Sequence, residues 1–422
     1  MFGGVRGRTN FGLVLSAGVF LAAAPALAAD LGSDGFADLE ERIAELEATT
    51  ARKGNRKVSL TISGFVNHNI QWWDDGEESN AYVTTNGSDP SRFRFVGKAK
   101  IDKDWSAGYI IEIGVASAGQ AGNTADAIGG TSISLRHSAW FLESKSLGKV
   151  TVGQTSAVND GITEVTLAKS IVVAKPITIF TPNGAFNLRN SANGNSAGVT
   201  WTGLTRGQTT GVGEGDRYSL IRYDSPEFAG FVASANWGQD DFWAVALRYD
   251  GEFHGFKLAG GISYGEITDG TQGFGGSTTA GNDRGTTLGG SASVLHVESG
   301  LFATFAYGET ELAQSVVGAG NDRDYSNWNI QAGIQRKWIP LGKTTLYGEY
   351  YEGDFGQSSN NNIVGSEVDV WGLAAIQDID AAALQLYVAY RHYSADLTTR
   401  TGVAAIDTED FQTVFSGAKI SF

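Results

Sequence analysis

Four cationic side chains share one face of the segment RFRFVGKAKI. Arg92, Arg94, Lys98 and Lys100 alternate with the apolar residues Phe93, Phe95, Ala99 and Ile101. Because successive side chains of a strand point to opposite faces, this period of two gathers the cations on one face of a strand. The chemistry that such a face offers is electrostatic, because a row of fixed charges attracts some ions and repels others.

The sequence carries no motif of a common hydrolase or metalloprotease. Neither GxSxG nor HExxH occurs, and the chain has no cysteine. The histidines show no ligand spacing and fall on different expected strands; they are His68, His137, His254, His296 and His392. The acidic segment DDGEE at Asp74 could hold a divalent cation such as a calcium ion that bridges lipopolysaccharide, but we interpret it as a solvated loop. We therefore expect no enzyme activity, no cofactor and no metal site.

The first part of the chain has the features of an export signal. In residues 1–28, Arg6 and Arg8 precede an apolar run, and Ala26-Leu27-Ala28 has the pattern of a cleavage site. The formal net charge of the whole chain is −15, and loss of the two arginines makes the mature part more acidic, which argues against a nucleic-acid partner. After the signal no apolar run approaches the roughly 18 to 20 residues of a membrane helix, so entry into a membrane would require a closed barrel.

Residues 29–57 differ from the rest, because Leu39, Ile43 and Leu46 follow a helical spacing among charged residues. We predict a short periplasmic helical segment that either associates with copies of itself or is a mobile stub.

From Val58 onward the apolar period is two, and we predict an all-β chain of sixteen strands over residues 58–422. They begin near Val58, Ser91, Ser106, Thr131, Leu147, Arg217, Ala229, Asp241, Gly255, Thr286, Leu301, Tyr325, Thr344, Ser366, Ala382 and Glu409. Short connections alternate with mostly long, glycine-rich ones, and GQD after Trp237 is the one short exception among the latter. A soluble secreted β protein has no reason to sort its loops in this way, whereas an outer-membrane barrel has short periplasmic turns and long external loops.

Aromatic residues cluster near the expected strand ends, which suits two interfacial girdles. Near the long loops these are Trp72, Trp73, Trp237, Tyr264, Tyr307 and Tyr325; near the short turns they are Trp105, Tyr223, Phe228, Phe253 and Trp338. The longest connection, 156–216, contains the stretch ITEVTLAKSIVVAKPITIF, which is too ordered for a simple solvated loop.

Four segments carry a resemblance that covers nearly the whole mature chain: ELEATTARKGNRKVSLTISGFV, SRFRFVGKAKIDKDWSAGYIIEIGV, SLRHSAWFLESKSLGKVTVGQT and the terminal GAKISF. They resemble the general trimeric porins of Gram-negative bacteria, and most closely the α-proteobacterial branch. The resemblance implies a 16-stranded antiparallel transmembrane β-barrel, a homotrimer and a third loop, here 156–216, that folds inward. It implies an outer-membrane channel, in contact with lipid and lipopolysaccharide, for passive diffusion of small hydrophilic solutes and ions. The terminal Phe422 resembles the signal that the barrel-assembly machinery reads.

The resemblance also implies a pore constriction in which wall arginines face carboxylates of the inward loop. The matching wall residues are Arg92, Arg94, Arg136 and Arg217, and the matching loop residues are Asp160 and Glu164. Lysines and arginines in the same loop offset its acids, so the sequence leaves the charge selectivity open. The alternatives are an outer-membrane barrel enzyme and a soluble secreted β protein.

Overall fold

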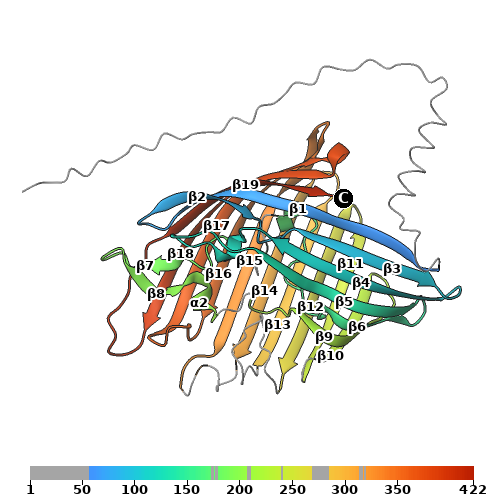
Figure 1. Cartoon of the computed structure of the whole chain (residues 1–422), viewed down its shortest axis with the longest axis horizontal. Coiled ribbons are helices and arrows are strands. Elements are labelled where there is room, and N and C mark those ends of the chain that lie inside the picture. Colours follow the sequence, from blue (N-terminus) through green and yellow to red (C-terminus); the bar gives the residue numbers. More distant parts are fainter. Residues whose placement is uncertain are drawn as a thin grey trace, which may run out of the picture. The chain divides into compact units, whose positions relative to one another are not determined.

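Antiparallel strands close into a barrel in the computed structural model (Figure 1), which describes residues 57–172, 175, 179–206, 211–238, 241–268, 285–312, 317 and 320–422. The expected signal peptide and nearly all of the expected helical segment 29–57 lie outside these residues. The barrel strands are β1 Ser59–Asp74, β3 Arg92–Lys100, β4 Trp105–Ala116, β5 Ser132–Ser144, β6 Gly148–Ser156, β9 Arg217–Asp224, β10 Phe231–Gly238, β11 Phe242–Phe253, β12 Phe256–Ile267, β13 Gly285–His296, β14 Leu301–Leu312, β15 Asp324–Ile339, β16 Gly342–Phe355, β17 Ile363–Ile379, β18 Leu384–Thr399 and β19 Phe411–Ser421. β1 pairs with β19 and closes the barrel, which confirms the predicted 16-stranded fold.

One further strand, β2 (Ser79–Thr85), lies in what the sequence suggested to be a long loop. β2 pairs with the second half of β1, from His68 to Asp74, and β3 pairs with the first half, from Ser59 to Phe65. The two strands therefore share one position in the wall beside β1. Pairing with β2 satisfies backbone groups of β1 that would otherwise form an open edge.

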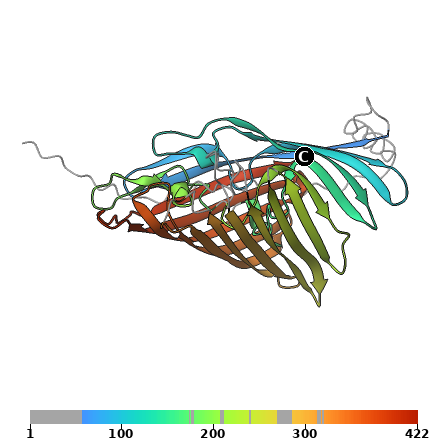
Figure 2. The same ribbon diagram turned by 90° about the horizontal axis from the view of Figure 1, so that it is seen from below.

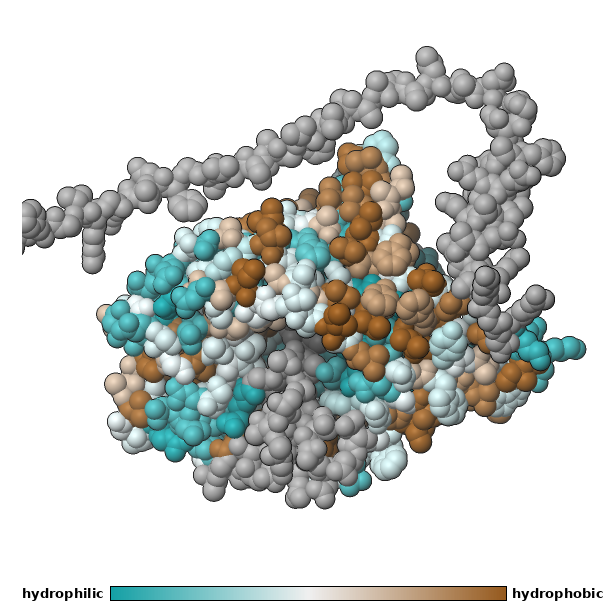
Figure 3. All heavy atoms as spheres, viewed as in Figure 1, coloured by the Kyte–Doolittle hydropathy of each residue, from teal (hydrophilic) through white to brown (hydrophobic). Residues whose placement is uncertain are grey.

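Side chains alternate between the outside and the inside of the barrel as the period of two predicts. On β1, Ile62 and Val66 are exposed on the outer face, whereas Asn67 and Gln71 are buried on the inner face. Figure 3 shows hydrophobic residues gathered over the middle of the visible face, with hydrophilic residues toward the left, where Figure 1 places β7 and β8. Figure 2 shows the strands of the middle and end of the chain, in olive to red, side by side. An apolar outer surface of this kind is suited to lipid.

The described connection between β6 and β9 packs against the inner face of the sheet. Its contacts pass in order from β10 to β18: Val158 N–H donates to Asn236 Oδ1 (2.8 Å), Leu167 N–H to Ser293 Oγ (3.1 Å), Ser170 Oγ to Gln331 Oε1 (2.8 Å), and Tyr393 OH to the Ile179 carbonyl (2.8 Å). The connection includes a hairpin of β7 (Asn187–Arg189) and β8 (Ser196–Thr200) and a short helix α2 (Trp201–Leu204). Among the described residues, short 3-10 helices span Gln120–Gly122, Ser170–Val172 and Asp380–Ala382. In the described part of the chain, no helix has the length and apolar character needed to cross a membrane.

A large aromatic cluster fills the space between this connection and the strands that close the barrel; we call it the aromatic core. It consists of Trp73, Phe180, Phe186, Trp201, Tyr325, Tyr351, Phe355, Tyr393 and Phe411 with neighbouring aliphatic residues. Phe186 contacts Trp73 and Phe411 edge-on, with ring centroids 4.8 Å and 5.0 Å apart. Trp73 and Tyr325 are 1% and 0% exposed, so their assignment to an interfacial girdle was wrong, because both rings point inward. Trp237 is on the outer face, where a girdle residue belongs.

Candidate functional site

Three arginines surround one carboxylate on the inner face of β3, β4 and β5. Arg136 Nε lies 2.6 Å from Glu112 Oε1, Arg92 Nη1 lies 3.7 Å from the same oxygen, and Arg94 pairs with Glu112 Oε2. The antiparallel register places Arg94 opposite Glu112, and β5 follows on the other side of β4. We call these four residues the guanidinium cluster. The Glu112 side chain is fully buried. Because three arginines share its single negative charge, the cluster holds two positive charges in excess.

A β-bulge brings Arg136 into this cluster. Glu112 pairs with His137 and Ile113 pairs with Leu135, so Arg136 is an extra residue of β5 with no partner in the register. The bulge turns Arg136 and His137 toward the same side of the wall. His137 Nδ1 then lies 3.2 Å from Thr155 Oγ1 on β6, while Arg136 reaches Glu112.

A second carboxylate extends the charged wall toward β1 and β19. Asp89 lies 2.9 Å from Arg92 Nη2 and 2.6 Å from Lys419 Nζ. Both cations also lie over the ring of Phe65, with Arg92 Cζ 4.9 Å and Lys419 Nζ 4.1 Å from its centroid. The aromatic face and the carboxylate hold the two cations at the lumenal wall.

Arg217, at the first position of β9, links the wall to the connection. Its guanidinium lies 3.2 Å from Asp160 Oδ2 and 3.1 Å from Asp216 Oδ1. Glu164 instead pairs with Lys175, at 2.8 Å, within the same connection. The structure therefore places the six candidate residues in three groups: Arg92, Arg94 and Arg136 on Glu112, Arg217 with Asp160, and Glu164 with Lys175.

A buried carboxylate, Glu214, fixes the fold of the connection next to Asp160. It accepts hydrogen bonds from Gly161 N–H (2.7 Å), Thr163 N–H (2.5 Å) and Thr163 Oγ1 (2.5 Å). Burial and the nearby Glu164 raise the pKa of Glu214 well above its usual range, and the Thr163 hydrogen bonds oppose this shift. Asp160 is also held by Arg248 on β11, whose Nη2 donates to the Asp160 carbonyl at 3.1 Å.

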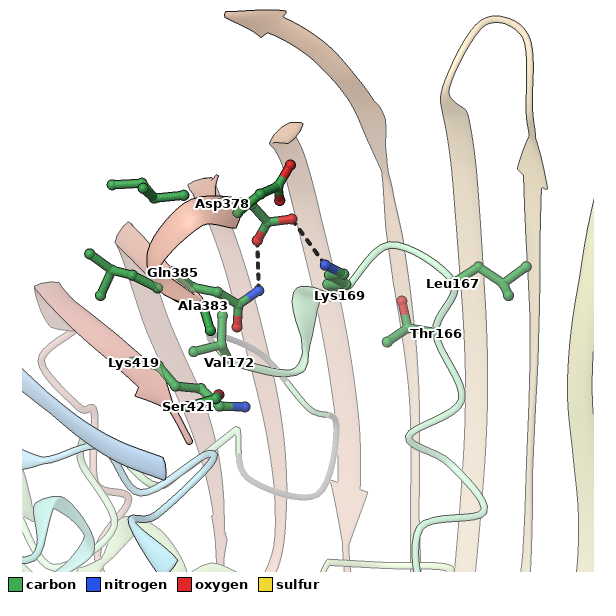
Figure 4. A pocket seen from close by; sticks show the side chains of 12 residues that line it. Thr166, Leu167, Lys169, Val172, Asp378, Ala383, Gln385, Lys419 and Ser421 are labelled. Carbon is green, nitrogen blue, oxygen red and sulfur yellow. Dashed lines mark hydrogen bonds and ion pairs between the residues drawn. The ribbon is translucent and has the colours of Figure 1, made fainter. Parts of the chain in front are cut away.

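Farther along, the connection is tied to the wall by an ion pair close to a cavity. Lys169 Nζ lies 3.1 Å from Asp378 Oδ2, and Gln385 Nε2 donates to the other oxygen of Asp378 at 2.9 Å (Figure 4). This cavity, of about 560 Å³, lies beside the turn between β17 and β18. The connection is thus attached near both the start of β9 and the end of β17.

Sequence reasoning missed Glu112, Asp89, Lys419 and Glu214. The signal for Glu112 was present in AGYIIEIGV, where a lone carboxylate interrupts the inner face between two outward isoleucines. The turn between β3 and β4 is short, so this carboxylate had to lie opposite an arginine of β3. Lys419 and Asp89 are far apart in the sequence and meet only through barrel closure. No group of His, Asp or Glu suited to a metal ion occurs among the residues that the structure describes.

Solved structures share the fold at low sequence identity. OmpT, an outer membrane protein of Vibrio cholerae, is 13% identical with a TM-score of 0.52, over 88% of this chain and 99% of that chain. The anion-selective porin from Comamonas acidovorans is 16% identical with a TM-score of 0.53, over 86% of this chain and 100% of that chain. No curated protein sequence matches the chain.

The family comparison agrees with the barrel fold. A family model described as Gram-negative porin matches residues 13–396. Together with the closed antiparallel sheet, the match makes this protein an outer-membrane channel for small solutes. The chain belongs to the family of Gram-negative porins.

Proposed function

We propose that the guanidinium cluster and the docked connection form the constriction of the channel and give it a preference for anions. The observation that carries this proposal is the arrangement of three guanidinium groups on the single carboxylate of Glu112. The Arg94 side chain is 41% exposed, so part of the excess positive charge reaches water in the lumen. In a narrow aqueous passage the local field, and not the charge of the whole protein, decides which ion enters.

The acids of the connection that face this wall are largely neutralised by cations beside them. Glu164 pairs with Lys175, Asp160 pairs with Arg217, and burial favours the protonated form of Glu214. The remaining field runs from the cationic wall toward the connection, and a dipolar solute orients along it. The fixed geometry matters here because each cation already has its hydrogen-bond partner and does not reorganise as a solute passes.

Other features are proposed on the strength of the resemblance. The channel is a homotrimer of the α-proteobacterial branch, it stands in outer-membrane lipid and lipopolysaccharide, and it has no catalytic activity. The barrel-assembly machinery recognises the last strand and the terminal Phe422 that follows it, whose side chain is exposed and whose backbone pairs with Gly64. The short turns face the periplasm and the long loops face outward.

A planar-bilayer recording in a potassium chloride gradient tests the proposed selectivity. The wild-type protein should form stable channels whose reversal potential shows preference for chloride at 0.1 M salt. Asp160→Asn removes a carboxylate beside Arg217 and should strengthen this preference. A cation-selective wild-type channel would contradict the proposal, even though the protein would still be a porin.

A further inference from the structure

A second cavity lies in the lumen between the guanidinium cluster and the short turns. Its volume is about 510 Å³, and β3, β4, β5, β6 and β9 line it. Val96 and Ile110 pair with each other one step of the inner face below Arg94 and Glu112, so this cavity follows the cluster directly along the wall.

The cavity has an apolar side. Val96, Ile110 and Phe141 contribute hydrocarbon surface to a lumen that is polar elsewhere on this wall. An apolar lining of this kind adds nothing to the passage of a hydrated inorganic ion. It can, however, remove hydrocarbon surface of a solute from water, which is favourable in proportion to the area covered.

The cavity carries one positive charge in excess, because its lining has three cations, Lys98, Lys149 and Arg222, and two carboxylates, Glu143 and Asp224. Lys98 pairs with Glu143 at 2.5 Å, and Arg222 pairs with Asp224 at 2.8 Å. Lys149 stands opposite Glu143 on β5 and Asp224 on β9, whose carboxylates already bind Lys98 and Arg222, and its Nζ lies over the Phe141 ring, 4.6 Å from the centroid. The ring stabilises the ammonium by a cation–π contact without neutralising it.

We propose that this cavity is a binding subsite for a small monocarboxylate that carries a hydrocarbon body, such as an aromatic acid. The proposal rests on the proposed function, because the solute reaches the cavity through the channel. The carboxylate would pair with Lys149, and the hydrocarbon would lie against Val96, Ile110 and Phe141. One positive charge in excess suits one carboxylate better than two, because Glu143 and Asp224 balance the other two cations.

The subsite would hold its solute weakly, as conduction requires. A site in a channel has to bind well enough to draw the solute in and loosely enough to release it. The ion pair with Lys149 is partly open to water, where such pairs contribute little, and the apolar contact covers only one side of the solute. Binding would therefore appear as brief interruptions of the ion current.

The test uses benzoate as a blocker of the potassium chloride current through single channels of the full-length protein. Benzoate in the millimolar range should interrupt the wild-type current more than benzamide, which has the same shape without the charge, and more than acetate, which lacks the ring. Block is expressed relative to the open-channel current of the same variant. If all three additives act equally, the proposal is wrong.

Substitutions test whether benzoate blocks the current by binding in this cavity. Lys149→Met should weaken it about fivefold, the scale of one partly exposed ion pair, and Lys149→Arg should retain it. Phe141→Ala should weaken it as well. Lys103→Met removes the same charge from the exposed turn between β3 and β4, outside this cavity, and should leave the block as in the wild type.

The outcomes separate this inference from the proposed function. Channels that conduct potassium chloride with the expected selectivity, but in which Lys149→Met does not change the block by benzoate, would overturn the subsite alone. An absence of channels in the wild type would overturn the function on which it rests.

Discussion

The two sides of the barrel use the same ion pair for different purposes. On the side of β15 to β19, Arg391 and Glu349 form a single pair, with Arg391 Nε 2.6 Å from Glu349 Oε1, beneath the aromatic core. On the side of β3 to β5, one glutamate serves three arginines, and Arg94 remains 41% exposed. A pair of matched charges under a hydrophobic cover anchors the connection, whereas an excess of cations left uncovered creates a field in water. Both sites use arginine and glutamate. Their different roles therefore come from the ratio of arginine to glutamate and from whether hydrophobic residues cover the charges.

The largest expected effect concerns the buried pair. Arg391→Met leaves Glu349 charged and buried, and should destabilise the protein by about 3 to 5 kcal/mol. The Arg391 guanidinium also donates to the Ile179 carbonyl at 3.4 Å, so its loss should loosen the connection. Thermal unfolding of the detergent-solubilised protein measures the effect. The double variant Arg391→Met with Glu349→Gln should regain most of the loss, and equal instability of the single and double variants would contradict this account of the pair.

The charged side lacks a core inside the barrel, so its stability should depend on backbone pairing and on its outer face. Ile111 lies on the outer face of β4 next to Glu112, and Ser63 lies on the inner face of β1 opposite Arg94. Ile111→Lys should destabilise the barrel by roughly 2 to 4 kcal/mol, whereas Ser63→Lys should be tolerated. The fraction of folded protein on an unboiled gel compares the two. Equal assembly would mean that the outer face is not in lipid.

The ion selectivity of the channel should depend on the arginines of the charged side and not on the buried pair of Arg391 and Glu349. Arg92→Ala with Arg136→Ala should shift the reversal potential toward cations, by roughly twofold or more in permeability ratio at 0.1 M salt, and raise the conductance modestly. The shift should shrink at 1 M salt, where the screening length falls from about 10 Å to about 3 Å. Arg391→Met with Glu349→Gln is the matched control. A shift of equal size in that control would remove the distinction between the two sides.

The smallest expected effect is a pH dependence of the docked connection beside the charged wall. Because the pKa of Glu214 in the folded protein lies above its unfolded value of about 4.3, the folded state holds the extra proton. This stabilisation is complete below the unfolded pKa and is lost as the pH rises through the folded value. Single-channel noise should therefore increase as the pH rises from the unfolded pKa through the folded pKa of Glu214. In Glu214→Gln the increase should be absent; a variant with the wild-type pH dependence would show that another group titrates.

Strand positions and faces could be predicted from the sequence because they depend on local alternation. RFRFVGKAKI specifies both a strand and its inner face, and the alternation of short and long connections specifies the direction of each strand. β2 escaped prediction because its pairing partner is only the second half of β1. A short strand that pairs with only half of its neighbour has too few residues to show a clear alternation in the sequence.

The inner packing could not be predicted, because it depends on which long-range partner covers each inward side chain. Trp73 and Trp237 both stand near the expected outer ends of strands, yet one is buried in the aromatic core and the other is exposed on the outer face. Alternation places Trp73 on the inner face of β1 and Trp237 on the outer face of β10. That the inner face is covered at Trp73 depends on the path of residues 179–204 across the inside of the barrel. The same holds for Arg391, whose burial under that path makes it an anchor.

The composition of the aromatic core has a consequence for the order of folding. The core joins Trp73 of β1 to Phe411 of β19, together with rings of the connection between β6 and β9. These contacts span most of the chain, so they cannot form until the last strand has joined the first, and long-range contacts of this kind form slowly. The part of the connection that packs in the aromatic core can therefore settle only after the first and last strands lie together. A chain halted before its final strand would lack Phe411 and with it the contact that joins Phe186 of the connection to the last strand, so closure of the barrel and completion of the aromatic core are one event.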